Sequence, residues 1–368
     1  MLSLDVSLHY PGFHLSVQQT LPATGVTALF GRSGSGKSTL LRVIAGLEPN
    51  ADGRVAWQEE LWQNGNAGNK RQFTPPHKRG LGMVFQDTRL FPHLNVAQNL
   101  AYADKRARHL PGPAMADIIE AFDLGALLAR HPDNLSGGEA SRTAIARALL
   151  TRPRMLLMDE PLAALDEARK TEILPYLERL RDQIGTPILY VSHNMAEVAR
   201  LANTLMLIDM GKITHHGPLE ALLADPGVAP ALGLRDAGAV IQAMLTAQDD
   251  DGLSRLTTSA GTLFLPRIEA PLGSHLRIRI LAQDVILSRT APQGLSALNI
   301  LPATVTDLRT GAGPGALVQL RAGQDDILAR ITRRSATALG LAPGSPCFAI
   351  LKSVSVAQGS IGTTLARP

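Results

Sequence analysis

Short apolar runs alternate with helical periodicity over the first 229 residues of the chain. Val26–Phe30, Met155–Met158 and Ile188–Val191 are continuous apolar segments, typical of strands buried on both faces of a parallel sheet. Thr39–Ala45 and Gly138–Leu150 have apolar residues at helical spacing. This alternation predicts an α/β fold with a mostly parallel sheet.

The pattern changes near residue 224, where proline and glycine interrupt regular structure. Beyond this point, short strand-like segments are separated by Gly and Pro residues. Their spacing predicts a small all-β barrel or sandwich. The expected strands are Leu276–Leu281, Ala303–Thr306, Ala316–Leu320, Ile327–Ile331 and Cys347–Leu351.

The overall composition limits the classes of protein to which this chain can belong. Lys+Arg number 36 and Asp+Glu 32, a formal charge of +4 over 368 residues, which does not favour a nucleic-acid surface. The one cysteine, Cys347, is expected to be a buried apolar side chain. The N-terminus lacks a signal-peptide pattern, and no apolar run reaches the ~20 residues that a membrane span needs. We therefore expect any membrane role to require a partner.

A glycine-rich motif follows the first of the apolar runs. Gly31-Arg32-Ser33-Gly34-Ser35-Gly36-Lys37-Ser38, continued by Thr39, matches G-x-x-x-x-G-K-[ST] between a predicted strand and a predicted helix. Its glycines allow consecutive N–H groups to face phosphate oxygens, and the following helix presents its positive end there. We expect Lys37 to meet the β- and γ-phosphates and Ser38 to offer a hydroxyl to Mg²⁺.

Two carboxylates end the apolar strand Met155–Met158. Because the carboxyl ends of parallel strands face the ligand crevice, Asp159 is expected to hold Mg²⁺ and Glu160 to act as general base on a water molecule. Alone, this pair would be equally compatible with a solvated acidic turn. The glycine-rich motif favours the catalytic interpretation.

The segment Leu135-Ser136-Gly137-Gly138-Glu139 decides between families that share these two motifs. It resembles the signature sequence of ABC ATPases, with Glu139 where Gln is frequent and Ala140-Ser141 in place of a more polar pair. Further motifs follow in the order of that family, and the resemblance extends over residues 1–220. They are Gln86 as the Q-loop glutamine, Ala164-Leu165-Asp166 as the D-loop and His193 as the switch histidine.

The resemblance implies a P-loop ABC ATPase domain with a helical subdomain, using ATP and Mg²⁺. It also implies a head-to-tail dimer, in which Ser136 and Gly138 of one copy cap the γ-phosphate held by Lys37 of the other. Nucleotide contacts would extend to Gly137 and Asp166. Glu160, His193 and Gln86 would be the catalytic residues, and Ser38, Gln86 and Asp159 the metal ligands. Tyr10 and Phe13 both precede the phosphate loop at about the right distance to stack on adenine, with Tyr10 favoured, and a core or turn aromatic is an equal alternative for either.

The segment Gly82–His93 is similar to that of binding-protein-dependent importers. In these proteins it opens the helical subdomain, here predicted over residues 90–134, which grips a helix of the membrane subunit. Leu90 and Phe91 would contact that helix, although ordinary packing inside the subdomain is an equal alternative. The resemblance implies a peripheral protein on the cytoplasmic face of the inner membrane, with separate permease subunits.

The C-terminal part suggests a cargo. Ser296-Ala297-Leu298-Asn299 resembles the start of a molybdate-binding-like domain, and Leu351–Val356 resembles its end, with room between them for a five-stranded OB-like barrel. Ser296, Lys352 and Ser353 are the candidate oxyanion ligands. Leu298 stands at a position that is often basic in such domains, so a barrel used for subunit contact or regulation is the alternative.

Together these features predict three regions. They are an ATPase domain over residues 1–229, a linker and the start of the β-rich region over 230–290, and a molybdate-binding-like barrel over 291–361. The chain resembles the motor subunit of a molybdate importer, with tungstate tolerated and a periplasmic molybdate-binding protein as an indirect partner. Sulfate, iron or another solute is the alternative cargo. A soluble ABC protein of translation or DNA repair is disfavoured, because the sequence has one cassette and no coiled-coil insertion.

Overall fold

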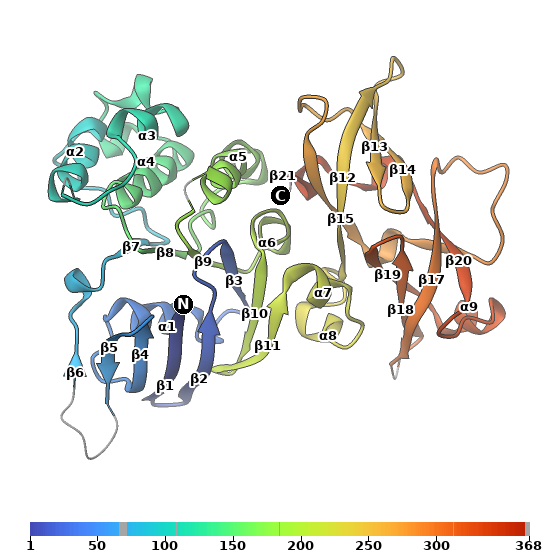
Figure 1. Ribbon diagram of the computed structural model, residues 1–368, viewed down its shortest axis with the longest axis horizontal. Coiled ribbons are helices and arrows are strands. Elements are labelled where there is room, and N and C mark those ends of the chain that lie inside the picture. The colour runs from blue at the N-terminus through green and yellow to red at the C-terminus, as the bar shows by residue number, and fades with distance from the viewer. Residues whose placement is uncertain (66–71, 108, 184, 312, 365–368) are drawn as a thin grey trace. The chain divides into compact units, whose positions relative to one another are not determined.

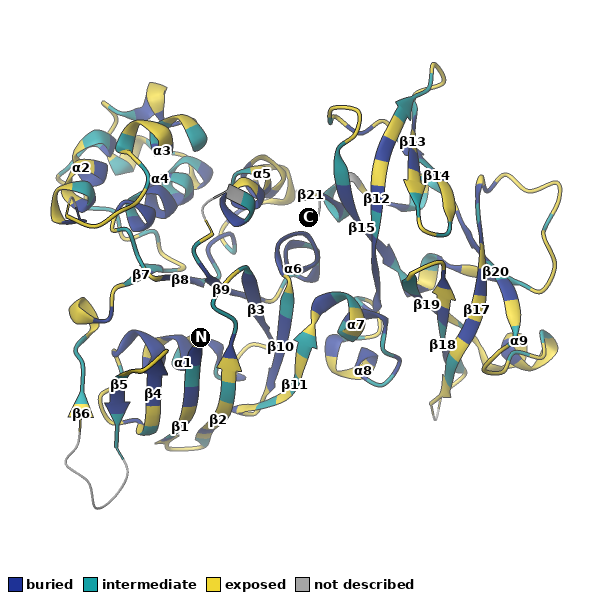
Figure 2. Cartoon of the chain, in the orientation of Figure 1, coloured by how far each residue is buried: buried dark blue, intermediate teal, exposed yellow. Residues whose placement is uncertain are grey.

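The computed structural model describes residues 1–65, 72–107, 109–183, 185–311 and 313–364 (Figure 1). The chain divides into two compact units. One contains residues 1–194 and 201–216, and the other contains residues 195–200 and 217–368. Each unit has its own cluster of buried apolar side chains. Figure 2 colours the buried residues of the chain dark blue.

A six-stranded sheet in the order β11-β10-β3-β9-β8-β7 forms the centre of the first unit. Its strand pairs from β10 to β7 are parallel, and every residue of β3 and β9 is buried. The prediction of a parallel sheet from continuous apolar runs is therefore confirmed. The strands are β3 (Val26–Phe30), β7 (Leu81–Val84), β8 (Met155–Asp159), β9 (Ile188–Ser192), β10 (Thr204–Asp209) and β11 (Lys212–Pro218).

A second, antiparallel sheet in the order β2-β1-β4-β5-β6 completes this unit. Along β1, Leu2, Leu4, Val6 and Leu8 are buried and alternate with more exposed residues, the pattern of a strand with one face in the core. Helix α1 (Lys37–Ala45) shares one apolar core with strands of both sheets. The strands are β1 (Leu2–Tyr10), β2 (Phe13–Leu21), β4 (Asp52–Trp57), β5 (Glu60–Asn64) and β6 (Gln72–Phe73).

Three helices, α2, α3 and α4, gather in a lobe beyond the β7 end of the six-stranded sheet (Figure 1). This is the helical subdomain that the sequence predicts. The helices and 3-10 turns between β6 and β10 are η1 (Pro76–Lys78), α2 (Val96–Ala107), α3 (Met115–Ala121), η2 (Gly125–Leu127), η3 (Pro132–Asn134), α4 (Gly137–Leu149), α5 (Glu167–Gln183) and α6 (Met195–Leu201).

The second unit consists mainly of two five-stranded antiparallel sheets, in the orders β14-β13-β12-β15-β21 and β16-β20-β17-β18-β19. Side chains of both sheets, such as Ile278 and Leu320, belong to one buried cluster. The second sheet is the OB-like part, so the expected all-β C-terminal domain is confirmed. The strands are β12 (Gly238–Gln248), β13 (Leu253–Thr258), β14 (Gly261–Pro266), β15 (His275–Leu281), β16 (Ile286–Ser288), β17 (Asn299–Thr310), β18 (Gly315–Ala322), β19 (Asp325–Thr332), β20 (Pro346–Leu351) and β21 (Ile361–Thr364).

Short helices connect these strands, and regular structure begins earlier than the sequence pattern indicates. Strands β12, β13 and β14 occupy much of the region 230–290, for which only the stretch Leu276–Leu281 was predicted as a strand. Within the described residues, none of the helices combines the length and hydropathy that a membrane span requires. The short helices are α7 (Leu219–Ala224), α8 (Ala229–Leu232), η4 (Ala282–Asp284), α9 (Arg333–Ala338), η5 (Ser353–Ser355) and η6 (Gln358–Ser360).

Candidate functional site

The glycine-rich loop joins the buried strand β3 to helix α1. A Cβ atom on Gly31 would lie 2.3 Å from the backbone oxygen of Ile208, so no larger residue fits there. Gly36 has a φ of 104° and closely faces the ring of Phe13. As the N-cap of α1, Gly36 offers no side-chain hydrogen bond to the first turn. The helix therefore presents uncapped N–H groups and its positive dipole end, an arrangement that suits an anion.

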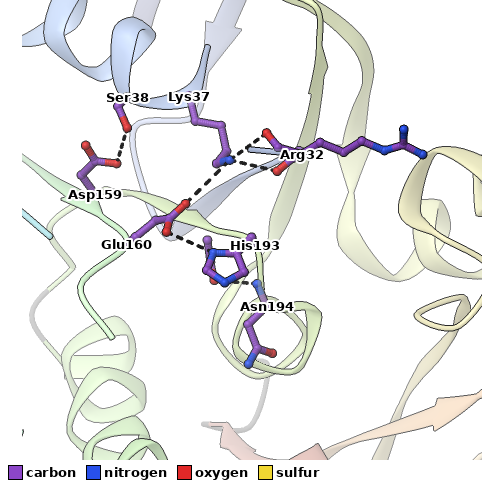
Figure 3. A network of polar contacts seen from close by, with 9 residues as sticks. Arg32, Lys37, Ser38, Asp159, Glu160, His193 and Asn194 are labelled. Carbon is purple, nitrogen blue, oxygen red and sulfur yellow. Dashed lines mark hydrogen bonds and ion pairs between the residues drawn. The ribbon is translucent and has the colours of Figure 1, made fainter. Parts of the chain in front are cut away.

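Lys37 is the first residue of α1 and is 5% exposed. Its Nζ atom donates to the backbone oxygens of Gly31 at 2.9 Å and Arg32 at 3.1 Å. The carboxylate of Glu160 lies 3.7 Å away (Figure 3). These contacts hold the ammonium group at the mouth of the loop, where the motif predicts phosphate oxygens.

Asp159, the last residue of β8, faces the start of α1. The Ser38 hydroxyl donates to its Oδ1 at 3.0 Å (Figure 3). Burial is the main cause that raises the pKa of Asp159, with the charge of Glu160 adding to it, while the Ser38 hydrogen bond and Lys37 oppose the shift. The sequence-predicted metal ligands Ser38 and Asp159 thus come together, and their two oxygens fit a hard cation such as Mg²⁺.

Glu160 contacts the histidine that follows β9. Its Oε2 lies 3.0 Å from His193 Nδ1 (Figure 3). Glu160 adopts a φ of 46°, and its N–H is fixed by the Val191 oxygen at 3.1 Å. A left-handed backbone at a residue other than glycine costs of order 1–3 kcal/mol, and such residues concentrate at active sites. The strained turn directs the carboxylate toward both Lys37 and His193.

The signature segment begins helix α4 through a capping box. The Ser136 hydroxyl accepts from the Glu139 N–H at 3.3 Å, and the Glu139 carboxylate accepts from the Ser136 N–H at 2.7 Å. This backbone hydrogen bond is the main cause that lowers the pKa of Glu139. Glu and Gln can both fill this capping position, which gives a physical account of Glu139 in place of Gln.

Contacts from the signature helix reach the acidic turn and the D-loop. The buried Ser141 hydroxyl donates to the Pro161 oxygen at 3.3 Å, directly after Glu160. Gly137 closely faces Leu165, the middle residue of the D-loop. Asp166 accepts from the Arg169 N–H at 2.9 Å and so caps helix α5. Ser141, whose presence here departs from the family pattern, therefore joins two of the predicted functional segments.

Comparisons with known proteins show which families the chain resembles. Residues 15–163 match the family model described as ABC transporter, and residues 295–358 match the TOBE domain. The molybdenum import ATP-binding protein ModC of Thiobacillus denitrificans is 49% identical over 352 residues, covering 95% of this chain and 96% of the relative. ModC of Methylococcus capsulatus is 47% identical, covering 95% and 98%. ModC 1 of Azotobacter vinelandii is 47% identical, covering 94% and 96%.

The chain belongs to the ModC family. Its ATPase-like unit and its β-rich unit both lie within the matched length, so the family assignment concerns the whole chain and not the ABC cassette alone.

Other residues predicted for the ModC nucleotide site lie outside the cluster of Lys37, Asp159, Glu160 and His193. Gln86 is exposed and borders a cavity of about 420 Å³ together with Leu90, Gly137 and Ser141. No contact recorded among the described residues joins Gln86 to Ser38 or Asp159. Ser136 is likewise exposed at the start of α4.

The two aromatic candidates lie on either side of the hairpin turn between β1 and β2. Tyr10 is 43% exposed, and a hydrogen bond with Glu48 is the main cause that raises its pKa. The Phe13 ring packs against Gly36 of the phosphate loop. Both aromatic residues therefore remain candidates for the adenine contact, and Phe13 is the one in direct contact with the loop.

In the TOBE region, Ser296 and Lys352 are exposed, and Ser353 is half-buried. Asn299, fully buried, bridges two segments there: its Nδ2 donates to the Phe264 oxygen at 3.0 Å and lies 3.4 Å from Ser353 Oγ. Among the described residues, no recorded contact joins Ser296 to Lys352 or Ser353. Leu298, at the position that is often basic, is 52% exposed.

Arg147 of α4 was not singled out from the sequence. Its guanidinium donates to the Arg89 oxygen at 2.8 Å, the Thr88 oxygen at 3.4 Å and Asn99 Oδ1 at 3.3 Å. Asn99 is fully buried and also holds both backbone groups of Phe91. Arg147 thus fixes the segment after Gln86 onto the signature helix. A charge inside the apolar stretch Ala144–Leu150 was the available signal.

Proposed function

We propose that this chain is the ATP-hydrolysing subunit of a binding-protein-dependent ABC importer that powers molybdate uptake through a separate permease, with tungstate tolerated. The observation that carries the proposal is the 49% identity to a molybdenum import ATP-binding protein over 95% of the chain. The assembled cluster of Lys37, Asp159, Glu160 and His193 supports an intact ATPase rather than a degenerate relative.

In this proposal the phosphate loop binds ATP. Backbone N–H groups between Ser33 and Thr39, apart from that of Ser35, which donates to the Arg32 oxygen at 3.2 Å, would face the phosphates. Gly31 allows the loop to close, and Lys37 adds a fixed cation. Ser38, Asp159 and Gln86 would hold Mg²⁺, which would supply positive charge beside the phosphate oxygens. The 3.0 Å Ser38–Asp159 contact supports two of these three ligands.

Glu160 acts as the general base that orients and deprotonates the attacking water, and Gln86 approaches the same site. The hydrogen bond to His193 supports this role, because it restrains the carboxylate that must accept the proton. His193 is 59% exposed and remains accessible to a γ-phosphate. Tyr10 stacks on adenine, with Phe13 as the alternative.

Each ATP site is completed by a second copy of the chain in a head-to-tail dimer. Ser136, Gly137 and Gly138 of that copy cap the γ-phosphate, and Asp166 lies close to the same interface. The exposure of Ser136 and Gly137 supports this, because both are accessible at the positive end of helix α4. The interface is incomplete in one copy alone.

The remaining partners follow from the importer assignment. The chain works as a peripheral protein at the cytoplasmic face of the inner membrane, where Leu90 and Phe91 contact the integral permease subunits. A periplasmic molybdate-binding protein delivers the cargo to that permease. The domain organisation proposed is an ATPase domain over 1–229, a linker and the start of the β-rich region over 230–290, and a molybdate-binding-like domain over 291–361. Residues Ser296, Lys352 and Ser353 are the proposed oxyanion ligands, and a regulatory or contact role of the barrel is the alternative.

Molybdate uptake, with sulfate as competitor, tests the proposal in cells that lack their own molybdate importer. The cells carry this chain with a cognate permease and binding protein. We expect uptake that survives excess sulfate and is lost with Glu160→Gln. Sulfate-sensitive or absent molybdate uptake with intact ATPase activity would keep the motor and assign another cargo, such as sulfate or iron.

A further inference from the structure

The β-rich unit contains a cavity of about 730 Å³ that is separate from the three proposed oxyanion ligands. It lies between the face of the β17-β18-β19 sheet and the segment that contains α8. Pro226, Pro230 and Leu234 line one side, and Leu317 and Ile331 line the other. The volume is within the range of about 300–1,000 Å³ that is typical of small-molecule sites.

Two arginines flank the apolar floor of this cavity. In the strand register, Arg309 of β17 is paired with Leu317 of β18, which is paired with Arg330 of β19. Residues in one such row project from the same face of a sheet, and neighbouring strands are about 4.8 Å apart. The backbones of the two arginines are therefore about 10 Å apart. Leu317, between them, is 8% exposed and packs with Ala229 of α8.

The guanidinium groups of Arg330 and Arg309 differ in their polar partners. Within the described residues, the Arg330 side chain has no recorded ion pair or hydrogen bond. Arg309 is paired through its Nε with Asp307 at 2.9 Å and is 56% exposed. The nearby Asp225 carboxylate is engaged by the Gly227 N–H at 2.6 Å. Asp307 and the nearby Asp225 offset the charge of Arg309, whose ion pair with Asp307 uses only Nε, so the uncompensated positive charge beside Leu317 lies at Arg330.

The absence of a side chain at Gly227 leaves room for the Arg309 guanidinium. A Cβ atom on Gly227 would lie 2.2 Å from Arg309 Nη1. The arginine head therefore fits closely over the backbone of the segment that forms the opposite wall. Any side chain at residue 227 would displace it.

We propose that this cavity binds a small organic dianion with an apolar middle and a carboxylate at each end. The apolar floor and prolines would cover the hydrocarbon part, and each guanidinium would pair with one carboxylate. A bare tetrahedral oxyanion would fill little of this volume and leave the apolar wall in contact with water. The site is thus distinct in chemistry from the one proposed at Ser296, Lys352 and Ser353.

Calorimetric titration of the full chain with succinate, adipate, suberate and sebacate tests the proposal. We expect affinity to rise with chain length until the two carboxylates reach both arginines, and octanoate to bind more weakly than suberate. Loss of one charge-assisted pair predicts about tenfold weaker binding of the best dicarboxylate by Arg330→Gln. Arg309→Gln has a smaller effect, because Asp307 already neutralises part of that charge.

Control variants separate the cavity from general charge effects. Arg321→Gln removes an exposed arginine of β18 that pairs with Asp326, and it should leave binding unchanged. Gly227→Ala should weaken binding by displacing Arg309. If no dicarboxylate binds, or if Arg330→Gln and Arg321→Gln behave alike, the proposal is wrong. Competition by molybdate alone, without any dicarboxylate binding, would overturn it in favour of a simple oxyanion site.

Discussion

At the scale of single residues, the candidate site brings together side chains that are far apart in the sequence. Ser38 and Asp159 are 121 positions apart, and Glu160 and His193 are 33 apart. Glu160 makes contacts with several of these distant segments. It contacts a cation and an imidazole, and its left-handed backbone is held by a neighbouring strand.

Glu160→Gln tests the role of the carboxylate as base. The amide keeps the shape and a hydrogen bond to His193 but cannot accept a proton, so we expect ATP turnover to fall by about 100-fold or more. ATP affinity should stay within a few-fold, and an ATP-bound dimer should accumulate. Steady-state hydrolysis and fluorescent-nucleotide binding measure the two effects. Normal turnover in this variant would remove Glu160 from the proposed role.

Glu139 predicts a pH-dependent contribution to stability. Its folded-state pKa is lowered, chiefly by the Ser136 N–H, so its stabilisation is present above the unfolded pKa of about 4.3 and is lost as the pH falls through the folded value. Glu139→Gln should therefore lower the unfolding free energy slightly at neutral pH and not at acidic pH. Urea unfolding at both pH values measures this.

Glu172→Gln is the matched control, because Glu172 is exposed on helix α5. It should show no such dependence on pH. Glu139→Ala should lose about 0.3–1.5 kcal/mol at neutral pH, since the capping hydrogen bond itself disappears. Equal stability of the Gln and Ala variants would contradict the capping role.

At the scale of elements, helix α4 links the signature segment to the loop after Gln86. Its first turn is closed by the Ser136–Glu139 box, its buried Ser141 reaches Pro161, and Arg147 near its end holds the backbone of residues 88 and 89. The loop and the helix are thus positioned by the same element. A displacement of α4 would therefore move both segments, and under the proposed function this movement would link ATP binding to the permease contact.

Arg147→Ala should lower the unfolding free energy by about 2 kcal/mol, because the Thr88 and Arg89 oxygens lose their charged donor. Stimulation of hydrolysis by the reconstituted permease should fall more than basal hydrolysis. Arg147→Lys should recover only part of both, since an ammonium cannot match the fork geometry of a guanidinium. Urea unfolding and ATPase assays measure the effects.

The exposed Arg334 of α9 supplies the control for this prediction. Arg334→Ala should change neither stability nor stimulation. The positioning role would be disproved by an Arg147→Ala variant with reduced stability but unchanged relative stimulation by the permease, because stability alone would then explain the residue.

At the scale of the whole molecule, a head-to-tail dimer predicts complementation between defective copies. Lys37→Ala removes the phosphate cation, and Ser136→Asp keeps a good N-cap while placing a negative charge toward the γ-phosphate. Each variant alone should hydrolyse ATP poorly. A mixture should exceed the sum of the two separate activities several-fold, because each mixed dimer contains one intact composite site.

Ser136→Asn is the neutral control for this experiment, because it keeps the cap without adding charge. It should retain more activity than Ser136→Asp. If mixing never raises activity although gel filtration shows that dimers exchange, the signature segment does not complete the site of the partner copy.

The sequence by itself determined the features that depend on the local pattern of residues. Continuous apolar runs predicted β3, β8 and β9, helical spacing predicted α1 and α4, and the ordered motifs predicted the family. These succeed because a buried strand needs apolar residues on both faces, and because a phosphate loop needs glycine wherever a Cβ would collide. Gly31 and Gly36 illustrate the second requirement.

Only the tertiary structure decided which distant groups meet. Strands β12 to β14 alternate weakly in hydropathy. They form one sheet in which β12 pairs with β15, and side chains of this sheet share a core with the other sheet. The contacts of Arg147 and the row Arg309–Leu317–Arg330 likewise follow from packing and strand register. Register is set by long-range burial and turn geometry, so a charge pattern along the chain does not show which arginines will face one cavity.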